Sequence, residues 1–183
     1  MINRLGILLL LAAVTSLSGC AGGGHGRDIN DPSNSLVFGY VDMSAAPTKV
    51  SGAHIMQVAP PTDKPYWGTD VRDGLFYTYY LPPGSYKLSS LHGSSMLRGE
   101  HQYNFPRQGG GETTARIDKP GIYFLGAYKY KDVKTGLFEA GKFNMERVNS
   151  PTEAELLRRI LQEAEIKGSA WEAKIRERLA RLK

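Results

Sequence analysis

Hydrophobic positions between residues 36 and 148 fall into short runs that are rich in valine, isoleucine, tyrosine and phenylalanine. Clusters of glycine and proline separate one run from the next, which is typical of β-strands joined by turns. The runs that predict strands cover residues 36–43, 53–59, 75–81, 85–91, 100–105, 113–117, 121–130 and 137–143. Because no helical pattern lies between them, the sequence predicts a mainly β fold, with residues 36–148 forming an antiparallel β-sandwich of seven or eight strands.

The spacing of hydrophobic residues changes to a helical period in residues 150–183. Ser150 as N-cap, Pro151 at the first helical position and Glu153 three residues after the cap predict a helix start. One face of this helix carries Leu156, Leu157, Ile160, Leu161 and Ala164. We therefore expect an amphipathic helix whose apolar face packs on the sandwich.

Gly168 interrupts this helix, and a second helical pattern follows it. Ser169 and Glu172 repeat the pattern of an N-cap followed three residues later by glutamate. Apolar residues then recur every three or four positions, at Trp171, Ile175, Leu179 and Leu182. Two consecutive amphipathic helices are therefore predicted at the end of the chain.

The N-terminal segment predicts export. Arg4 precedes an apolar run of 13 residues, 5–17, whereas a helix that spans a bilayer needs ~20, so a secretory signal is favoured over a transmembrane anchor. The sequence LSGC, which ends at Cys20, resembles the lipobox of bacterial lipoproteins. The resemblance implies that residues 1–19 are removed and that the thiol of Cys20 is diacylated.

Lipid on Cys20 would by itself provide a stable attachment to a membrane, because two or more acyl chains anchor firmly. Ala21 replaces the aspartate that resembles an inner-membrane retention signal, so the resemblance implies the periplasmic face of the outer membrane. In a Gram-positive organism it would imply the outer leaflet of the single membrane. The alternative is an ordinary secreted protein, or a buried free thiol, although the glycines around Cys20 provide no core.

Residues 20–35 contain almost no apolar side chains and predict a flexible linker between the lipid and the folded body. His25 lies among glycines, so we expect it to be solvated rather than bound to a metal ion. Cys20 is the one cysteine of the chain. With its thiol used for lipid, the protein has no disulfide and depends on an ordinary hydrophobic core.

The sequence LPPGSYKL, residues 81–88, predicts a strand end, a tight turn and a second strand. It resembles the hairpin of prealbumin-like or carboxypeptidase-regulatory-like β-sandwich modules, and similar residues return at 119–124. Together with the LSGC motif and the helical C-terminal segment, the chain resembles uncharacterised bacterial lipoproteins that carry such a module. This resemblance implies a β-sandwich and brings no catalytic residues.

The formal net charge of the chain is +5, and it falls to +4 when residues 1–19 are removed. This modest charge, together with export, argues against nucleic acid as a partner. Five basic residues on a strand and on the last helix are candidates for contact with an anionic partner: Lys129, Lys131, Arg176, Arg178 and Arg181. In the alternative interpretation these side chains are solvated, while the residues between them pack against the protein.

Tyr66 and Trp67 form the candidate ligand-binding pair, in a predicted loop that spans residues 59–70. Exposed rings in a loop on a rigid β-scaffold are suited to stacking on sugar rings, since loops carry much of the binding function of proteins. The alternative is that the two rings plug one end of the hydrophobic core. A glycan-binding or peptidoglycan-binding function depends on the exposure of both rings.

The histidines show no pattern that is typical of a metal site. His54, His92 and His101 belong to different strand segments and lack the i, i+4 or CxxC spacing of zinc ligands. No GxSxG sequence surrounds a serine, and the glycine run 109–111 lacks the lysine and hydroxyl residue of a phosphate loop. The sequence therefore predicts no metal, no cofactor and no enzymatic activity. A hydrolase whose histidines converge only in the fold is the alternative.

These observations together predict a non-enzymatic, lipid-anchored protein of the cell envelope. Its role would be binding or scaffolding in the periplasm. The membrane is the expected contact of the lipid, and an envelope protein or a glycan is the expected partner of the folded body.

Overall fold

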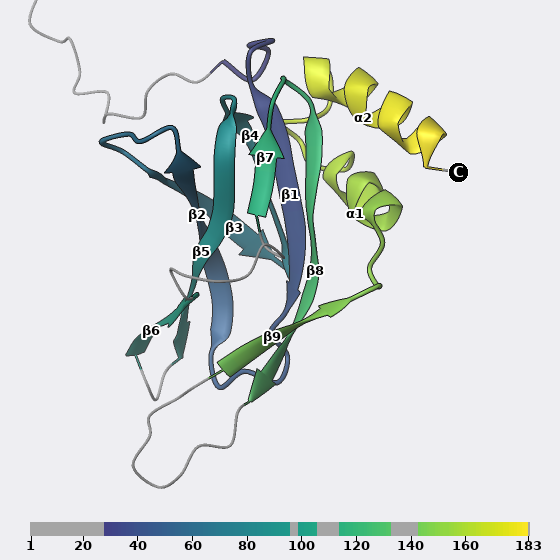
Figure 1. Ribbon diagram of the computed structural model, residues 1–183. Helices are drawn as coiled ribbons and strands as arrows, with labels where there is room; N and C mark the ends of the chain where they lie inside the picture. The colour runs from purple at the N-terminus through teal and green to yellow at the C-terminus, as the bar shows by residue number, and fades with distance from the viewer. Residues whose placement is uncertain (1–27, 96–98, 106–113, 133–142, 183) are drawn as a thin grey trace, which may run out of the picture.

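The computed structural model describes residues 28–95, 99–105, 114–132 and 143–182. Its strands are β1 (Ser35–Asp42), β2 (Lys49–Ala59), β3 (Tyr66–Arg72), β4 (Leu75–Leu81), β5 (Gly84–Ser95), β6 (Gly99–Asn104), β7 (Thr114–Ile117), β8 (Ile122–Asp132) and β9 (Phe143–Val148). Two helices follow, α1 (Glu153–Ile160) and α2 (Ala170–Arg181). The predicted mainly β fold with two C-terminal helices is therefore confirmed (Figure 1).

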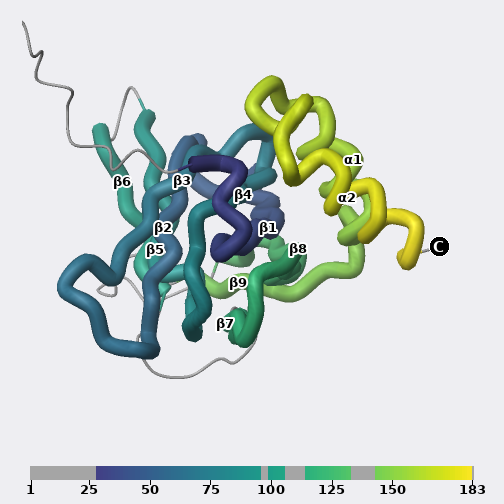
Figure 2. The backbone as a smooth tube through the Cα atoms, turned by 90° about the horizontal axis from the view of Figure 1, so that it is seen from above, coloured from purple at the N-terminus to yellow at the C-terminus, as the bar shows by residue number. Residues whose placement is uncertain are grey.

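The strands form one nine-stranded sheet that curls on itself into a sandwich-like body. Their order is β6-β5-β2-β3-β4-β1-β8-β9, and β7 pairs with β5 away from this path. The two halves are joined where β3 and β4 pair, and this pairing is restricted to Val71 with Phe76 and Arg72 with Leu75. Seen from above, β2, β5 and β6 lie on one side, β1 and β8 lie in the middle, and the helices lie beyond them (Figure 2).

One strand pair departs from the predicted antiparallel arrangement. β1 pairs with β4 in an antiparallel manner and with β8 in parallel. A parallel pair requires a long crossover connection, and here the chain from β2 to β7 provides it. The hydrophobic pattern along a strand reports which faces are buried and not the direction of its neighbour, so this parallel pair cannot be predicted from it.

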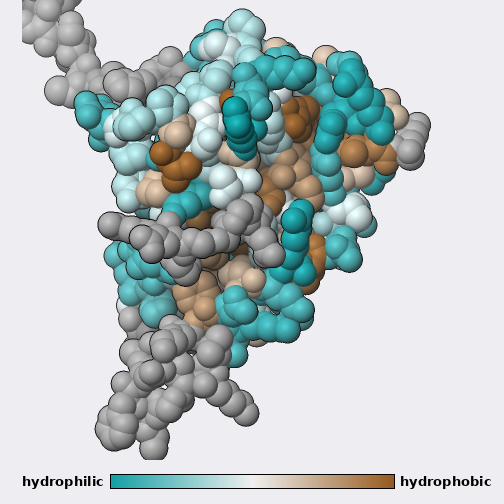
Figure 3. Space-filling model, viewed as in Figure 1, coloured by the Kyte–Doolittle hydropathy of each residue, from teal (hydrophilic) through white to brown (hydrophobic). Residues whose placement is uncertain are grey.

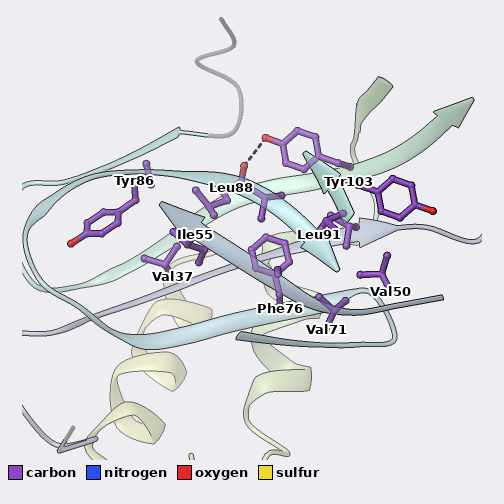
Figure 4. Close-up of a cluster of buried hydrophobic side chains, with 14 of the residues drawn as sticks. Val37, Val50, Ile55, Val71, Phe76, Tyr86, Leu88, Leu91 and Tyr103 are labelled. Carbon is purple, nitrogen blue, oxygen red and sulfur yellow. Dashed lines mark hydrogen bonds between the residues drawn. The ribbon is translucent and has the colours of Figure 1, made fainter. Parts of the chain in front are cut away.

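Side chains between the two halves of the sheet form the larger hydrophobic core (Figure 4). Ile55, Leu88 and Leu91 come from β2 and β5, while Val37 and Phe76 come from β1 and β4. Each of them is at most 1% exposed, and burial of such a side chain contributes about 1.5–3 kcal/mol. Because side chains alternate along a strand, the residues between them point to the outer faces of the sheet.

A second core lies between the helices and the outer side of β1, β4 and β8. Leu36 and Phe38 from β1 meet Leu157 and Ile160 from α1 and Trp171 from α2, and each is at most 1% exposed. β1 is therefore buried on both faces. Hydrophilic residues cover the outside of the helices, and hydrophobic residues gather between them and the strands (Figure 3).

The two similar turn sequences share one side-chain anchor. The hydroxyl of Tyr86 donates to the carbonyl oxygen of Pro82 at 2.8 Å, and the hydroxyl of Tyr123 donates to that of Lys119 at 2.7 Å. In both turns the tyrosine follows a Pro-Gly pair and closes back on the residue before that proline. The predicted turn between β4 and β5 is confirmed.

Helix α1 begins later than the sequence pattern predicts. Its N-cap is Thr152, whose side chain accepts from the backbone N–H of Glu155, while the carboxylate of Glu155 accepts from the backbone N–H of Thr152. The chain contains two overlapping capping sequences, SPTE and TEAE, and the prediction that Ser150 is the cap is wrong. The predicted cap of α2 is confirmed, because the side chain of Ser169 accepts from the backbone N–H of Trp171.

Strand β3 lies where the sequence predicts a loop. Glycine, threonine and aspartate within this strand weaken its hydrophobic pattern, yet it pairs with β2 from Gly52 opposite Asp70 to Met56 opposite Tyr66. Strand β9 begins at Phe143, the last residue of the predicted strand 137–143. Apart from its last residue, that predicted strand lies outside the described residues.

The described chain begins within the predicted linker. Ile29 packs against the second core, between the helices and the sheet. The side-chain oxygen of Asn30 accepts from the backbone N–H of Ala170 at 3.0 Å. The folded body therefore includes residues 28–35, and Ser35 already belongs to β1. The predicted signal segment and Cys20 lie outside the described residues. Neither helix in the described part of the chain is long and apolar enough to cross a membrane.

Candidate functional site

Mostly polar side chains occupy the outer side of β2, β3, β5 and β6, which we call the histidine face. It is defined by His54, Met56, Tyr66, Ser90, His92, Gln102 and Asn104. The inner side of the same strands carries the larger core, so alternation alone directs these residues outward. Neither helix covers this face, because both pack on the opposite half of the sheet.

Two histidines and a serine meet on this face. The pairing of β2 with β5 places His54 opposite Ser90, and His92 lies two residues further along β5. Nε2 of His92 is 2.8 Å from Nδ1 of His54 and 2.8 Å from Oγ of Ser90. The remaining side of the triangle, from Ser90 Oγ to His54 Nδ1, measures 3.5 Å. Sequence spacing along one strand cannot reveal such a cluster, because it depends on the register between two strands.

The third predicted histidine does not join this cluster. His101 is on β6, opposite Gly93 of β5. Its ring contacts that of Tyr103, with ring centroids 4.6 Å apart. Glu100, the residue before it, points to the other side of β6 and influences His92 through its charge. Within the described residues, no group of three or more His, Cys, Asp or Glu side chains is placed to hold a metal ion.

The electrostatic setting of His92 favours its neutral form. Burial, followed by the nearby ring of His54, lowers the pKa of His92 below its ordinary value, and Glu100 acts in the opposite direction. A histidine with a lowered pKa is unprotonated at neutral pH and presents a nitrogen lone pair. Hollows with volumes of about 450 Å³ and 620 Å³ open beside His92 and His54 respectively.

The geometry does not provide a hydrolytic centre around Ser90. A serine nucleophile has to be reachable by substrate and needs donors for the developing oxyanion. Ser90 is only 2% exposed, and its neighbours in β2 and β5 are joined by ladder pairing. The alternative of a hydrolase is therefore supported by the convergence of two histidines, but the serine beside them is not accessible as a nucleophile.

The structure places Tyr66 and Trp67 on β3, and the prediction that they lie in a loop is wrong. Consecutive residues of a strand point to opposite faces. Tyr66 is 53% exposed on the histidine face, whereas Trp67 packs against the larger core. The two rings therefore do not form one exposed platform, and glycan binding by this pair stays a prediction for Tyr66 alone.

Each of the five predicted basic residues lies beside a carboxylate. The pairs are Lys129 with Asp42 at 3.8 Å, Lys131 with Glu146 at 2.5 Å, Arg176 with Glu172 at 2.8 Å, Arg178 with Glu153 at 2.8 Å, and Arg181 with Glu177. The lysines lie towards the end of β8 and the arginines lie on α2, at opposite ends of the body (Figure 1). Contact of these residues with an anionic partner stays a prediction.

A smaller depression, with a volume of about 200 Å³, lies where β3 and β4 separate. The hydroxyl of Tyr77 donates to Glu165 at 2.5 Å, and Arg72 contacts Glu163 at 3.0 Å. Burial, followed by the hydrogen bond to Glu165, raises the pKa of Tyr77 above its usual value, so its hydroxyl keeps its proton. These contacts tie the α1–α2 connection to the sheet.

No family model and no curated protein match this chain. Among solved structures, it is similar to the major pilin subunit of Bacillus cereus, with 11% identity and a TM-score of 0.31. The similarity covers 51% of this chain and 29% of the pilin chain. A likeness of this size carries no argument about function.

Proposed function

We propose that the protein is an exported lipoprotein with a non-enzymatic binding or scaffolding role, held by lipid on Cys20 at the periplasmic face of the outer membrane. One observation carries the proposal: the sequence LSGC directly follows a 13-residue apolar run. Such a run is too short to remain as a membrane-spanning helix, which needs ~20 residues. The cysteine is therefore the attachment point.

The arrangement of the body is compatible with such an anchor. The described chain begins eight residues after Cys20, and eight extended residues span at most about 30 Å. The body would thus stand close to the bilayer, with the contact of Asn30 to Ala170 at its attached end. The histidine face would then remain open to the periplasm as the surface for a partner.

A non-enzymatic role is favoured by the side chains that remain accessible. Ser90 is buried, and Tyr77, whose pKa is raised, is hydrogen-bonded to Glu165. Neither offers the activated nucleophile that covalent catalysis requires. Binding through polar and aromatic side chains needs no such group.

The anchor is tested by Cys20→Ala in the producing cell, with Ser16→Ala as the matched control. We expect the Cys20 variant to accumulate as an unlipidated precursor, while the control is processed as the parent is. Mass spectrometry of the parent should find the mature chain starting at residue 20 with acyl groups. A parent chain with an unmodified N-terminus, or a start at another residue, would contradict the proposal.

The choice of membrane is tested by Ala21→Asp. We expect this variant to move from the outer to the inner membrane on a sucrose gradient, whereas Ala21→Ser should stay with the parent. Equal distribution of both variants would remove the outer-membrane assignment and leave the lipid anchor itself untouched.

Glycan binding is the second candidate function, favoured by the exposure of Tyr66 beside a hollow that Gln102 and Asn104 also line. Aromatic rings beside amide groups are suited to sugar hydroxyls and ring faces. Retention on peptidoglycan should be lost in Tyr66→Ala and kept in Tyr66→Phe. Equal retention of parent and Tyr66→Ala would exclude this function for Tyr66.

A further inference from the structure

The cluster of His54, Ser90 and His92 contains more close contacts than hydrogen bonds can satisfy. An imidazole nitrogen carries either one hydrogen or one lone pair, and each is directed along a single axis in the ring plane. Nε2 of His92 nevertheless has two partners at 2.8 Å, Nδ1 of His54 and Oγ of Ser90. One well-aligned hydrogen bond at this nitrogen leaves the other 2.8 Å contact unsatisfied, and the remaining contact, from Ser90 Oγ to His54 Nδ1, is longer at 3.5 Å.

Three electron-pair donors that converge on one point are the arrangement that a metal ion satisfies. Each of the two nitrogens and the hydroxyl oxygen can direct a lone pair to a cation placed between them. Ligand atoms around a tetrahedral zinc ion lie about 3.3 Å apart, as follows from bonds of about 2.0–2.1 Å. The two nitrogens would have to separate by only about half an ångström, which small side-chain rotations provide.

We propose that His54 Nδ1 and His92 Nε2 bind one divalent transition-metal ion, zinc(II) or copper(II), on the outer side of β2 and β5. The hydroxyl of Ser90 supports the site as a weak third donor, and water completes the coordination. Imidazole suits both ions, and neither needs an acidic residue in its first coordination sphere.

The surroundings of the cluster support this site. Nothing in the described structure covers the histidine face, and hollows on both sides of the cluster give an ion access. Glu100 on β6 adds negative charge near His92, which attracts a cation without acting as a ligand.

The two ligands come from neighbouring strands, so the ion would link β2 to β5 at the centre of this half of the sheet. β2 and β5 share the longest pairing of the fold, from Lys49 opposite Ser94 to Ala59 opposite Ser85. Register shifts interrupt this pairing, one of them between His54 and Ile55. Between the two histidines the pairing is regular, with Gly52 opposite His92 and His54 opposite Ser90, so His54 and His92 are diagonal neighbours on one face and within reach of one another.

The test uses the full chain, purified in detergent without an added histidine tag and stripped of metal with a chelator. Calorimetric titration with zinc chloride and copper sulfate should show one saturable site in the parent. We expect His54→Gln and His92→Gln each to weaken binding at least tenfold, because each removes one of two nitrogen ligands. His101→Gln is the matched control, since this histidine lies outside the cluster, and it should bind as the parent does.

Electron paramagnetic resonance of the copper-loaded parent provides a readout that does not depend on a variant. Coupling to two imidazole nitrogens is the expected result. Absence of nitrogen coupling, or binding in His54→Gln that equals the parent, would overturn the proposal. Equal weakening by His101→Gln would also overturn it, because it would indicate scattered surface binding. None of these outcomes depends on the lipid anchor.

Discussion

The two outer faces of the curled sheet are built from alternating strands and differ in the side chains that they present. Over β1 and β4, outward positions carry Leu36, Phe38 and Leu75, and the two helices cover them. On the histidine face, outward positions carry His54 and His92, and no described helix covers them. An exposed apolar face of that size would be a liability in solution. The helices therefore complete the core, and the face that they leave open is the one available for a ligand.

The largest expected effect is a difference in the loss of stability between a substitution under the helices and one on the open face. Trp171 of α2 is 1% exposed, and Trp171→Ala should destabilise the protein by about 3–5 kcal/mol, because it removes a large buried ring. Tyr66→Ala on the open face should change stability by no more than about 0.5 kcal/mol. Urea unfolding followed by circular dichroism measures both. Similar losses of stability for the two variants would contradict the difference between the covered and the open face.

The next effect concerns how the covering helices begin. Thr152→Ala removes the N-cap of α1 and should cost about 1 kcal/mol. Ser150→Ala is its matched control and should lie within about 0.5 kcal/mol of the parent, since Ser150 is outside the helix. The midpoint of urea unfolding distinguishes them. A larger loss of stability for Ser150→Ala than for Thr152→Ala would indicate that Ser150 is the N-cap, as the sequence pattern predicts.

A smaller effect is expected for the ion pair that joins the two helices. Arg178 and Glu153 are 2.8 Å apart, with side chains 40% and 17% exposed. A double-mutant cycle with Arg178→Met and Glu153→Gln should give a coupling of about 0.5–1 kcal/mol, since partial exposure screens the charges. The cycle for Arg181 and Glu177, which are both more exposed, should give a smaller value. The opposite order would contradict the expectation that the less exposed ion pair is the stronger one.

The smallest effect is a pH dependence confined to the open face. Burial and the neighbouring His54 lower the pKa of His92, so the unfolded chain binds a proton more readily than the folded protein does. Stability from neutral His92 should be complete above the ordinary histidine pKa of about 6.5 and should be lost as the pH falls through the lower folded value. His54 and Glu100 are the charged or titratable neighbours that act on it.

The measurement is the fall in Tm between about pH 7.5 and pH 5, a range in which histidines titrate. It should be larger for the parent than for His92→Gln. His101→Gln should keep the slope of the parent, because His101 lies outside the cluster. A His92→Gln protein with the parent's slope would show that His92 does not contribute to the pH dependence.

The fold could be predicted where the information is local. The turn from Leu81 to Gly84 and the apolar face of α1 are determined by residues close together in the sequence. β3 was missed because Gly68, Thr69 and Asp70 interrupt its hydrophobic pattern. The choice between two overlapping caps also depends on how the helix docks, which the capping sequences do not specify.

The candidate site could not be predicted from sequence spacing. His54 and His92 meet only because β2 pairs with β5 in one register, with an irregularity beside His54. Ser90 carries one weak signal, since it shares a strand face with His92 two residues away. Trp67 is predicted beside Tyr66, but consecutive strand residues face opposite sides, so Tyr66 is exposed while Trp67 is partly buried against the core.

The parallel pairing of β1 with β8 has a consequence for how the chain reaches its folded state. The backbone N–H of Gly121 donates to the side chain of Ser35 across 86 positions, so one edge of the first strand stays open until most of the polypeptide has been made. Topologies with such distant contacts fold slowly and expose unpaired edges meanwhile. A newly made chain of this kind would benefit from chaperones that bind it until β8 has been synthesised.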